Sequence, residues 1–172
     1  MNIFALSDDP KEAAQMHCDK HVVKMVLESA QMLSTVHHQY KSNMRSFVYK
    51  PTHANHPCTM WAGENQANYH WLFEHFNHLA DEYTHRYSRY HKTWEKLRKV
   101  LDVRPAGMPW AREHTPFARA MPDAYKWLDD PIDSYRLYYA VEKADILKYT
   151  NRERPKWLSD LQLGLETIEK LK

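Results

Sequence analysis

The run HCDKHVVKMVLESAQ at positions 17–31 mixes titratable and apolar side chains within one short segment. On a helix that turns about 100° per residue, one narrow stripe carries His17, His21, Lys24, Glu28 and Gln31. The other faces are largely apolar, so we expect a helix that is packed on most of its circumference and presents only this stripe to a cleft. Ionisable groups in such a place must be paired, hydrogen-bonded or shifted in pKa, because burying a lone charge is costly. The stripe is therefore a candidate reactive site.

Two other interpretations of this stripe stay open. It can be a solvated helix face, on which an i,i+4 pair such as Lys24 and Glu28 adds a little stability. Alternatively, His17 and His21 put two imidazoles on one face and can bind a divalent metal. Their order, H-x-x-x-H, lacks the adjacent glutamate of the metalloprotease motif, so further ligands would have to come from elsewhere. The main interpretation uses no metal or other cofactor.

Length and composition limit the fold that must position this stripe. The chain has 172 residues, which is enough for one domain with a sizeable core. It has only three glycines and many Ala, Leu, Met, Glu and Lys residues, which favours an all-α fold over a sheet-rich one. A formal charge of +2 is too small to require a nucleic-acid partner, although local basic clusters can still contact phosphate.

The cysteines and the hydropathy pattern bear on the compartment. Cys18 and Cys58 are the only cysteines, and their spacing matches neither a disulfide framework nor a zinc ribbon. A reducing cytoplasm is the expected location. The N-terminus lacks a basic segment followed by a long apolar run, and no stretch is apolar enough to span a bilayer, so neither secretion nor a membrane partner is expected.

The hydrophobic periodicity predicts a compact, single-domain bundle of about five to six helices with long loops, over residues 1–172. The first helix should begin after Asp9, which can cap it, with Pro10 in the first position and Glu12 closing a capping box. The predicted segments are a long helix over about 10–38, a loop over 39–57, a helical region over 58–101, a loop over 102–122, and helices over about 130–149 and 158–171.

Three short motifs resemble one family of DNA-repair enzymes. The run from Asp19 to Glu28, DKHVVKMVLE, resembles the first helix of the phage and bacterial pyrimidine dimer DNA glycosylases, where an acidic residue precedes basic residues and a glutamate follows nine positions later. NHPCTMW at 55–61 is similar to the HP-x-x-x-W entry to the second helix of bacterial members. RPKW at 154–157 is similar to the RP-x-W near the family's C-terminus. The order of the motifs is that of the family.

This resemblance implies an all-helical enzyme that binds double-stranded DNA and flips out a nucleotide. An amine would attack C1′ of the sugar and displace a damaged or modified pyrimidine, and β-elimination through an imine would then cleave the strand, which is AP lyase activity. Glu28 matches the family's catalytic glutamate, and His21 joins the catalytic candidates because it lies on the same stripe. If the chain is phage-encoded, the expected location is the host cytoplasm.

The amine is the point at which this sequence departs from the family pattern. In the family, a small second residue becomes the N-terminus after Met removal, and its α-amine, whose pKa lies near neutrality, is the nucleophile. Here residue 2 is Asn, a large residue before which Met is usually retained. The candidate amines are therefore that of Met1, if the N-terminal arm folds back to Glu28, and those of Lys20 and Lys24, because desolvated lysines form Schiff bases.

Two further groups of residues are candidates for the site. Cations for phosphate and an aromatic face for a base combine in the runs 91–99 and 151–157, in Lys92, Lys96, Arg152, Arg154, Lys156 and Trp157. The competing interpretations are a solvated helix face and a tryptophan that anchors the last helix. Cleft positions beside Glu28 are expected for His17, Gln31, His56, Glu64, Asn65 and Asn68.

Two other functions remain open at this stage. One is a metal-dependent hydrolase or transferase acting on nucleotides or nucleic acid, with its metal at His17 and His21. The other is a non-catalytic, helical DNA-binding phage module, in which the polar stripe only completes a buried network. Neither the target base nor the oligomeric state follows from the sequence.

Overall fold

Helices make up all of the regular secondary structure in residues 1–170, the part of the chain that the computed structural model describes, with the side chains of residues 168 and 169 excepted. The all-α class predicted from the sequence is confirmed. The described α-helices are α1 (Pro10–Met16), α2 (Asp19–Gln39), α3 (Pro57–Glu64), α4 (Gln66–Tyr87), α5 (Lys92–Leu101), α6 (Pro131–Glu142) and α7 (Lys156–Lys170). Short 3-10 helices lie at η1 (Asn43–Ser46), η2 (Asp123–Tyr125) and η3 (Ala144–Ile146).

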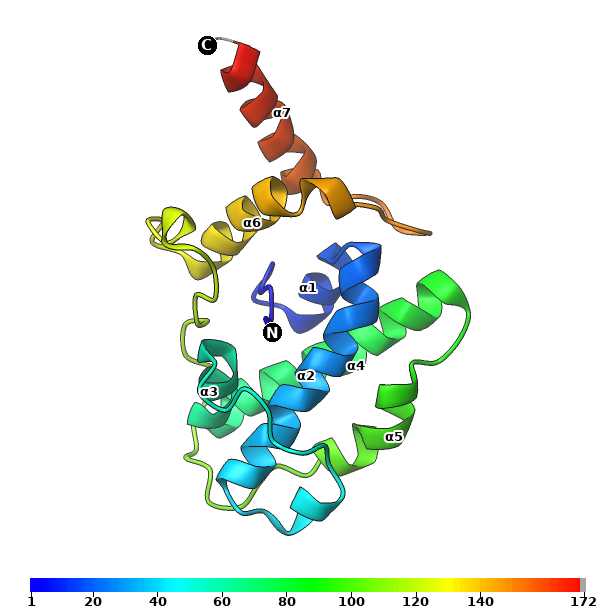
Figure 1. The fold of residues 1–172 in the computed structure, drawn as a ribbon, viewed down its shortest axis with the longest axis vertical. Coiled ribbons are helices and arrows are strands. Elements are labelled where there is room, and N and C mark those ends of the chain that lie inside the picture. The colour runs from blue at the N-terminus through cyan, green and yellow to red at the C-terminus, as the bar shows by residue number, and fades with distance from the viewer. Residues whose placement is uncertain (171–172) are drawn as a thin grey trace.

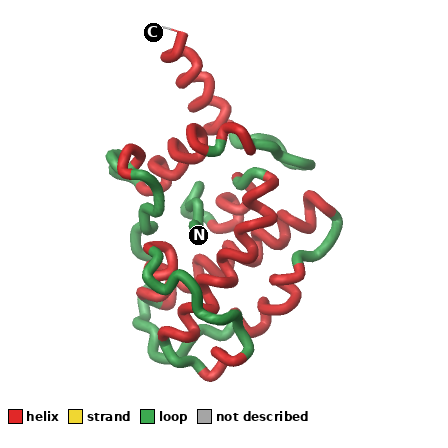
Figure 2. The backbone as a smooth tube through the Cα atoms, in the orientation of Figure 1, coloured by secondary structure: helices red, strands yellow, loops and turns green. Residues whose placement is uncertain are grey.

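The long helices α2 and α4 cross at the centre of the molecule (Figure 1). Helix α1 packs on α4, α3 packs on both long helices, and α5 lies along their other side. Helix α6 crosses one end of this group, and α7 projects from α6 so that its far end points away from the rest (Figure 2). None of the helices in residues 1–170 is long and apolar enough to cross a membrane.

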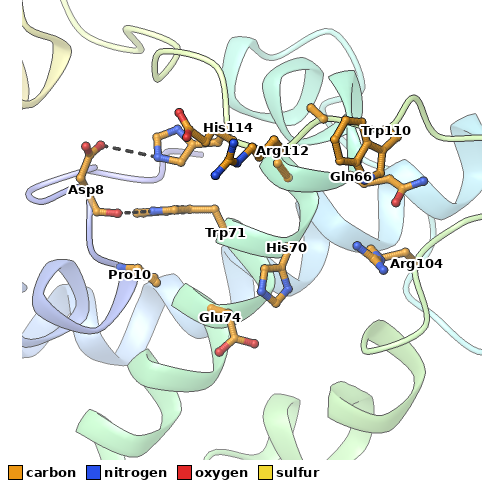
Figure 3. Close-up of a pocket in the computed structure, with 13 residues that line it drawn as sticks. Asp8, Pro10, Gln66, His70, Trp71, Glu74, Arg104, Trp110, Arg112 and His114 are labelled. Atoms are coloured by element: carbon orange, nitrogen blue, oxygen red, sulfur yellow. Dashed lines mark hydrogen bonds and ion pairs between the residues drawn. The ribbon is translucent and has the colours of Figure 1, made fainter.

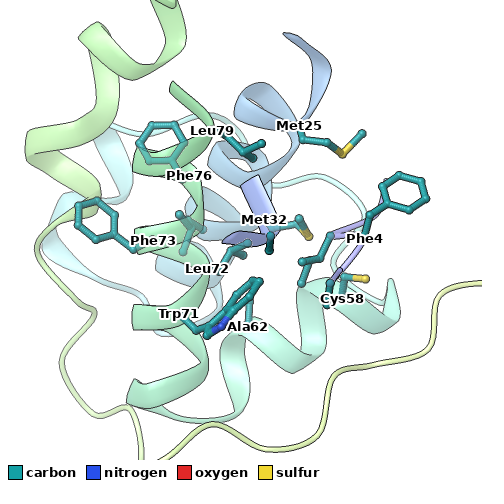
Figure 4. Close-up of a cluster of buried hydrophobic side chains, with 14 of the residues drawn as sticks. Phe4, Met25, Met32, Cys58, Ala62, Trp71, Leu72, Phe73, Phe76 and Leu79 are labelled. Atoms are coloured by element: carbon teal, nitrogen blue, oxygen red, sulfur yellow. The ribbon is translucent and has the colours of Figure 1, made fainter. Parts of the chain in front are cut away.

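The hydrophobic core lies mainly between α2 and α4 (Figure 4). Met25 and Met32 from α2 meet Leu72, Phe76 and Leu79 from α4, and all five are almost completely buried. Each such side chain contributes about 1.5–3 kcal/mol through removal of its apolar surface from water. This pair of helices is the frame on which the Glu28 stripe is held.

The single long first helix predicted from the sequence is wrong: it is two helices, α1 and α2. The backbone is extended at His17 and Cys18, with ψ angles of 140° and 164°. Hydrogen bonds to distant parts of the chain replace helical ones there. The Cys18 N–H donates to the Tyr139 hydroxyl at 2.9 Å, and the Asp19 N–H donates to the Lys148 carbonyl at 2.8 Å. Both acceptors come from the C-terminal part of the chain, so local periodicity does not reveal the break.

The start of α1 follows the prediction in part. The Asp9 side chain accepts from the Glu12 N–H at 2.8 Å, and Pro10 occupies the first turn. Glu12 does not close the capping box. Its carboxylate instead accepts from the Ser7 hydroxyl at 2.9 Å, and the Asp9 N–H donates to that hydroxyl oxygen at 3.2 Å.

The other predicted helical segments are helical, but the number of helices in them and the residues at which they begin and end differ from the prediction. The helical region over 58–101 is three helices, because Asn65 caps a new helix by accepting from two N–H groups and Ser88 ends it with a φ of 53°. The helix predicted over 130–149 ends at Glu142 and is followed by η3. The last helix starts two residues earlier than predicted, and its predicted end at Leu171 lies outside the described residues. The bundle therefore has seven α-helices in its described part, rather than five to six.

A buried ionic network joins the beginning of α2 to the end of α4. The Arg86 guanidinium, whose side chain is fully buried, donates to Asp19 at 3.0 Å and to Glu82 at 2.7 Å. Arg152 donates two hydrogen bonds to Glu82, at 2.8 and 2.6 Å. Burial alone would raise the pKa of Glu82, but the hydrogen bonds from Arg152 and Arg86 outweigh it and hold this pKa below its usual value. The charges are paired, which is the condition for burying them.

Four histidines are buried in the core and are neutral at pH 7. Burial is the largest cause that lowers the pKa of each, to about 3 for His17 and His75 and to about 4 for His21 and His37. In the unfolded chain these side chains take up protons near pH 6.5. The folded state therefore binds fewer protons than the unfolded state between about pH 6.5 and 4.

We expect the free energy of unfolding to fall steadily as the pH is lowered from 7 to 5. Each of the four histidines contributes up to about 1.4 kcal/mol per pH unit, because its folded-state pKa is depressed and the stability it gives is lost below the unfolded-state pKa. Urea unfolding at half-unit pH intervals measures the slope. His75→Phe should make the slope shallower, whereas a free energy of unfolding that stays constant over this range would contradict the neutral burial of these rings.

Candidate active site

The N-terminal arm, residues 2–7, is buried and extended although no described strand lies beside it. Asn2 shapes its beginning. Its Oδ1 accepts from the N–H groups of Ile3 at 2.8 Å and Phe4 at 3.0 Å, and its Nδ2 donates to the Ala120 carbonyl at 2.7 Å. Phe4 has a φ of 49°, a left-handed conformation that costs roughly 1–2 kcal/mol and persists only where the surroundings fix it.

The remainder of the arm is tied to two helices. The Leu6 carbonyl accepts from Nε of Arg136 in α6 at 3.0 Å. The Asp8 carbonyl accepts from Nε1 of Trp71 in α4 at 2.6 Å. These bonds fix the direction of the arm, so the position of its first residue is set by side chains from both halves of the chain.

The carboxylate of Glu28 lies against Met1 and Asn2, the first two residues of the chain. Its carboxylate is 8% exposed, and Oε2 accepts from the Asn2 N–H at 2.9 Å. The α-amino nitrogen of Met1 lies 3.8 Å from the same oxygen, and Nζ of Lys24 lies 3.3 Å from Oε1. The arm does fold back to Glu28, which is the condition under which the sequence made Met1 a candidate amine.

The side chain of Met1 is anchored while its main chain reaches the surface. The side chain is 2% exposed, and the Thr59 hydroxyl donates to its sulfur at 3.6 Å. The residue as a whole is half-buried, so its exposed area belongs mainly to main-chain atoms.

The beginning of α3 closes the other side of this site. His56 caps α3 by accepting from the Cys58 N–H at 3.2 Å. Burial lowers the pKa of His56, the positive charge of the N-terminus lowers it further, and Glu28 opposes both effects. Burial also raises the pKa of the Cys58 thiol to about 11, so the thiol is protonated at pH 7 and is not a nucleophile.

This geometry places a primary amine 3.8 Å from a buried carboxylate. An unprotonated amine can attack an electrophilic carbon and form an imine, and an adjacent carboxylate can accept or return the protons. The Met1 nitrogen is beyond ordinary hydrogen-bond length from Glu28, as is common in substrate-free sites that tighten when the substrate binds.

Three other candidate residues, one of them outside the stripe, take different positions. Lys20 is exposed and lies eight residues before Glu28, about 12 Å along the helix axis. His21 lies two turns away from Glu28, where its ring stacks on Phe4 at 4.5 Å and Nδ1 is 2.9 Å from the Tyr139 hydroxyl. Gln31 lies one turn after Glu28 and is half-buried.

The histidine pair considered for a metal is part of the core. The rings of His17 and His21 are 6.2 Å apart, and Nδ1 of His17 is 2.7 Å from the Ala13 carbonyl. His17 packs closer to His75, with ring centres 5.2 Å apart. Within residues 1–170 and their described side chains, no group of three or more His, Cys, Asp or Glu residues could hold a metal ion.

The predicted cleft residues Glu64, Asn65 and Asn68 lie at the far end of α3 from His56, about 12 Å along its axis. Asn68 and Glu64 both bond the Thr115 hydroxyl, at 2.8 Å each. Asn65 caps α4. Glu64 and Asn68 hold Thr115 of the loop over 102–122 against the helices, and the structure does not bring any of the three residues to Glu28.

The predicted DNA-contact residues divide into paired and exposed ones. Arg152 is committed to Glu82, and Trp157 donates from Nε1 to the Met16 sulfur at 3.4 Å beneath the Arg136 guanidinium. Lys96 lies over the Tyr49 ring, with its Nζ 5.0 Å from the ring centre. Lys96 is exposed all the same, as are Lys92, Arg154 and Lys156.

A separate pocket of about 640 Å³ opens between α4 and the loop over 104–114 (Figure 3). Trp71 and His70 lie on its α4 side, and the guanidinium groups of Arg104 and Arg112 line it together with three carboxylate residues. None of the catalytic, DNA-binding or cleft residues predicted from the sequence lines this pocket. The site around Glu28 is therefore separate from this pocket.

Asn2 is the functional residue that the sequence reasoning missed, since residue 2 was considered only for its size. Asn side chains commonly bond the backbone two residues on, which is the signal that was available. We expect Asn2→Leu, which keeps a large second residue and therefore Met1, to lower the free energy of unfolding by about 1–3 kcal/mol, because three hydrogen bonds are lost. It should also accelerate amide hydrogen exchange at Ile3 and Phe4.

Asn65→Leu is the matched control, because the Asn65 side chain also accepts from two nearby backbone N–H groups, those of Ala67 and Asn68 at the start of α4. It should cost similar stability in urea unfolding while leaving exchange at Ile3 and Phe4 unchanged. Equal exchange in the Asn2 variant and the wild type would show that Asn2 does not hold the arm.

Comparison with known proteins gives one match. Residues 1–96, more than half of the chain, match the family model described as pyrimidine dimer DNA glycosylase. This range contains the arm, all of α2 with Glu28, and α3. No curated protein and no solved structure matches the chain significantly.

Proposed function

The chain belongs to the pyrimidine dimer DNA glycosylase family, and on that premise we propose that the α-amine of Met1 is its nucleophile and Glu28 its proton-transfer group. The observation that carries this proposal is the 3.8 Å separation between the Met1 nitrogen and Oε2 of Glu28. The family supports DNA glycosylase activity on pyrimidine dimers in general, with DNA as the substrate. The amine, the carboxylate and the lyase step are our additions.

The proposed reaction begins on a nucleotide flipped out of double-stranded DNA. The unprotonated Met1 nitrogen attacks C1′, the glycosidic C1′–N bond breaks, and the bonding electrons leave with the base, which takes up a proton. Glu28 stabilises the positive charge that develops on the sugar and accepts a proton from the attacking amine. Ring opening of the sugar then gives an imine between C1′ and the Met1 nitrogen.

The lyase step uses the same two groups. The imine makes the C2′ hydrogen acidic, Glu28 removes it as a proton, and the 3′ phosphate leaves with the electrons of its C3′–O bond. Water then hydrolyses the imine and restores the free amine. Glu28 suits this role because its other contacts, to the Asn2 N–H and to Lys24, hold the carboxylate in place.

Retention of Met1 fits the surroundings of its side chain. The methionine side chain is almost completely buried against α3, so removing it would empty a packed site. If Met1 were removed, the Asn2 nitrogen, 2.9 Å from Glu28, would become the terminal amine in the same site. An intact mass of the purified protein distinguishes the two amines.

We expect borohydride to trap a covalent adduct between the protein and a duplex containing a cyclobutane pyrimidine dimer or an abasic site, because it reduces the imine to a stable amine. Peptide mapping should place the adduct on Met1. Glu28→Gln, which keeps the size of the side chain, should slow base release by about 10²–10⁴-fold. Acetylation of the α-amine should abolish trapping.

Lys24→Met and Lys20→Met separate the possible nucleophiles. Both lysines are exposed, but only Lys24 lies within reach of Glu28. Trapping at Met1 should survive both substitutions. An adduct mapped to either lysine, or base release without a trappable adduct, would contradict the proposed nucleophile.

A further inference from the structure

A second charged group lies beside the proposed site, in the part of the chain beyond the family match. Lys143 directly follows α6, and its Nζ lies 4.9 Å from the centre of the Tyr138 ring and 5.9 Å from that of the Phe4 ring. None of the ion pairs formed by the described side chains involves it. Aromatic faces hold an ammonium group in place without neutralising its charge.

The position of Lys143 relative to α2 is fixed by stacked rings. The Phe4 ring lies nearly parallel to His21 of α2, with centres 4.5 Å apart, and nearly parallel to Tyr138 of α6, with centres 6.1 Å apart. The arm that carries the Met1 amine therefore also spaces α6 from α2. The arm therefore links the position of the Met1 amine to that of the Lys143 ammonium group.

Lys24 lies on α2, one turn after His21 and one turn before Glu28, and its side chain is 64% exposed. Burial is the main cause that lowers the pKa of His21, and the charges of Lys143 and Lys24 lower it further. Lys143 thus lies beside the Phe4 ring of the stack, and Lys24 lies beside the Glu28 carboxylate.

We propose that Lys24 and Lys143 form a binding site for a phosphodiester group of the strand whose sugar faces the Met1 amine. This inference rests on the proposed function. Each sugar of the strand is linked to phosphates through its C3′ and C5′ oxygens. When C1′ of a sugar lies at the Met1 amine, a phosphate of the same nucleotide therefore lies close to the amine. Ammonium groups bind phosphate as point charges. Glu28 contacts Lys24 through Oε1 and accepts the Asn2 N–H through Oε2. The carboxylate therefore keeps a partner when Lys24 binds a phosphate.

The test measures DNA binding without chemistry. A duplex containing a tetrahydrofuran abasic analogue has no base to lose and no C1′ that can form an imine. Its affinity is measured by fluorescence anisotropy at several salt concentrations between about 50 and 200 mM. Lys143→Met should weaken binding and reduce the slope of log K against log salt by about 0.9, the contribution of one phosphate contact. Lys143→Arg, which keeps the charge, should retain the wild-type slope.

Lys99→Met is the matched control, because Lys99 is exposed on α5 beside Phe73 and Asn77, on a different surface. It should leave the slope unchanged. Lys143→Gln is a second charge-removing variant in case Lys143→Met does not fold, and circular dichroism melting establishes folding for each. An unchanged slope and affinity in a folded charge-removing variant would overturn the phosphate site.

Different results would contradict the phosphate site and the amine chemistry. A slope that falls in Lys143→Met, together with the absence of any borohydride adduct in the wild type, supports the phosphate site and refutes the amine chemistry. An adduct at Met1 together with an unchanged slope supports the amine chemistry and refutes the phosphate site.

Discussion

The structure depends on one constraint: an extended, buried N-terminal arm must satisfy its main-chain polar groups without a sheet. Unpaired N–H and C=O groups in a protein interior are costly, so partners must be supplied one by one. Asn2 uses its own side chain, Glu28 accepts the Asn2 N–H, and Arg136 donates to the Leu6 carbonyl. The carboxylate is thus a structural partner of the arm as well as the proposed proton-transfer group, which explains how it can stay in a mostly apolar helix.

The same constraint divides the predicted polar stripe into two zones. Before and at the start of α2, His17 and His21 are neutral rings packed among aromatic side chains, and they act as parts of the core. Toward the middle of α2, Lys24 and Glu28 lie beside the terminal amine. The aromatic ring of Phe4 packs on His21 and therefore belongs to the first zone.

Sequence reasoning succeeded where the signal was local. Helical periodicity gave the all-α class, and the Asp9–Pro10 pair gave the start of α1. The family motif placed Glu28 among the candidates, and the structure brings Met1 to it. Two of the failures depend on a partner that is distant in sequence. The break before Asp19 follows from acceptors in and after α6, and Arg152 turns inward because Glu82 of α4 receives it.

The arm has a consequence for the order in which the molecule is assembled. Met1 to Ser7 are the first residues made, yet Asn2 is fixed by Ala120 and Leu6 by Arg136, which lie 118 and 130 residues later. Contacts so distant in sequence form late and slow folding, because a long loop must close before they are made. During synthesis the chain therefore carries a free amine with no carboxylate held against it. The pairing of Met1 with Glu28 is completed only when nearly the whole chain has emerged, so incomplete chains lack an assembled site.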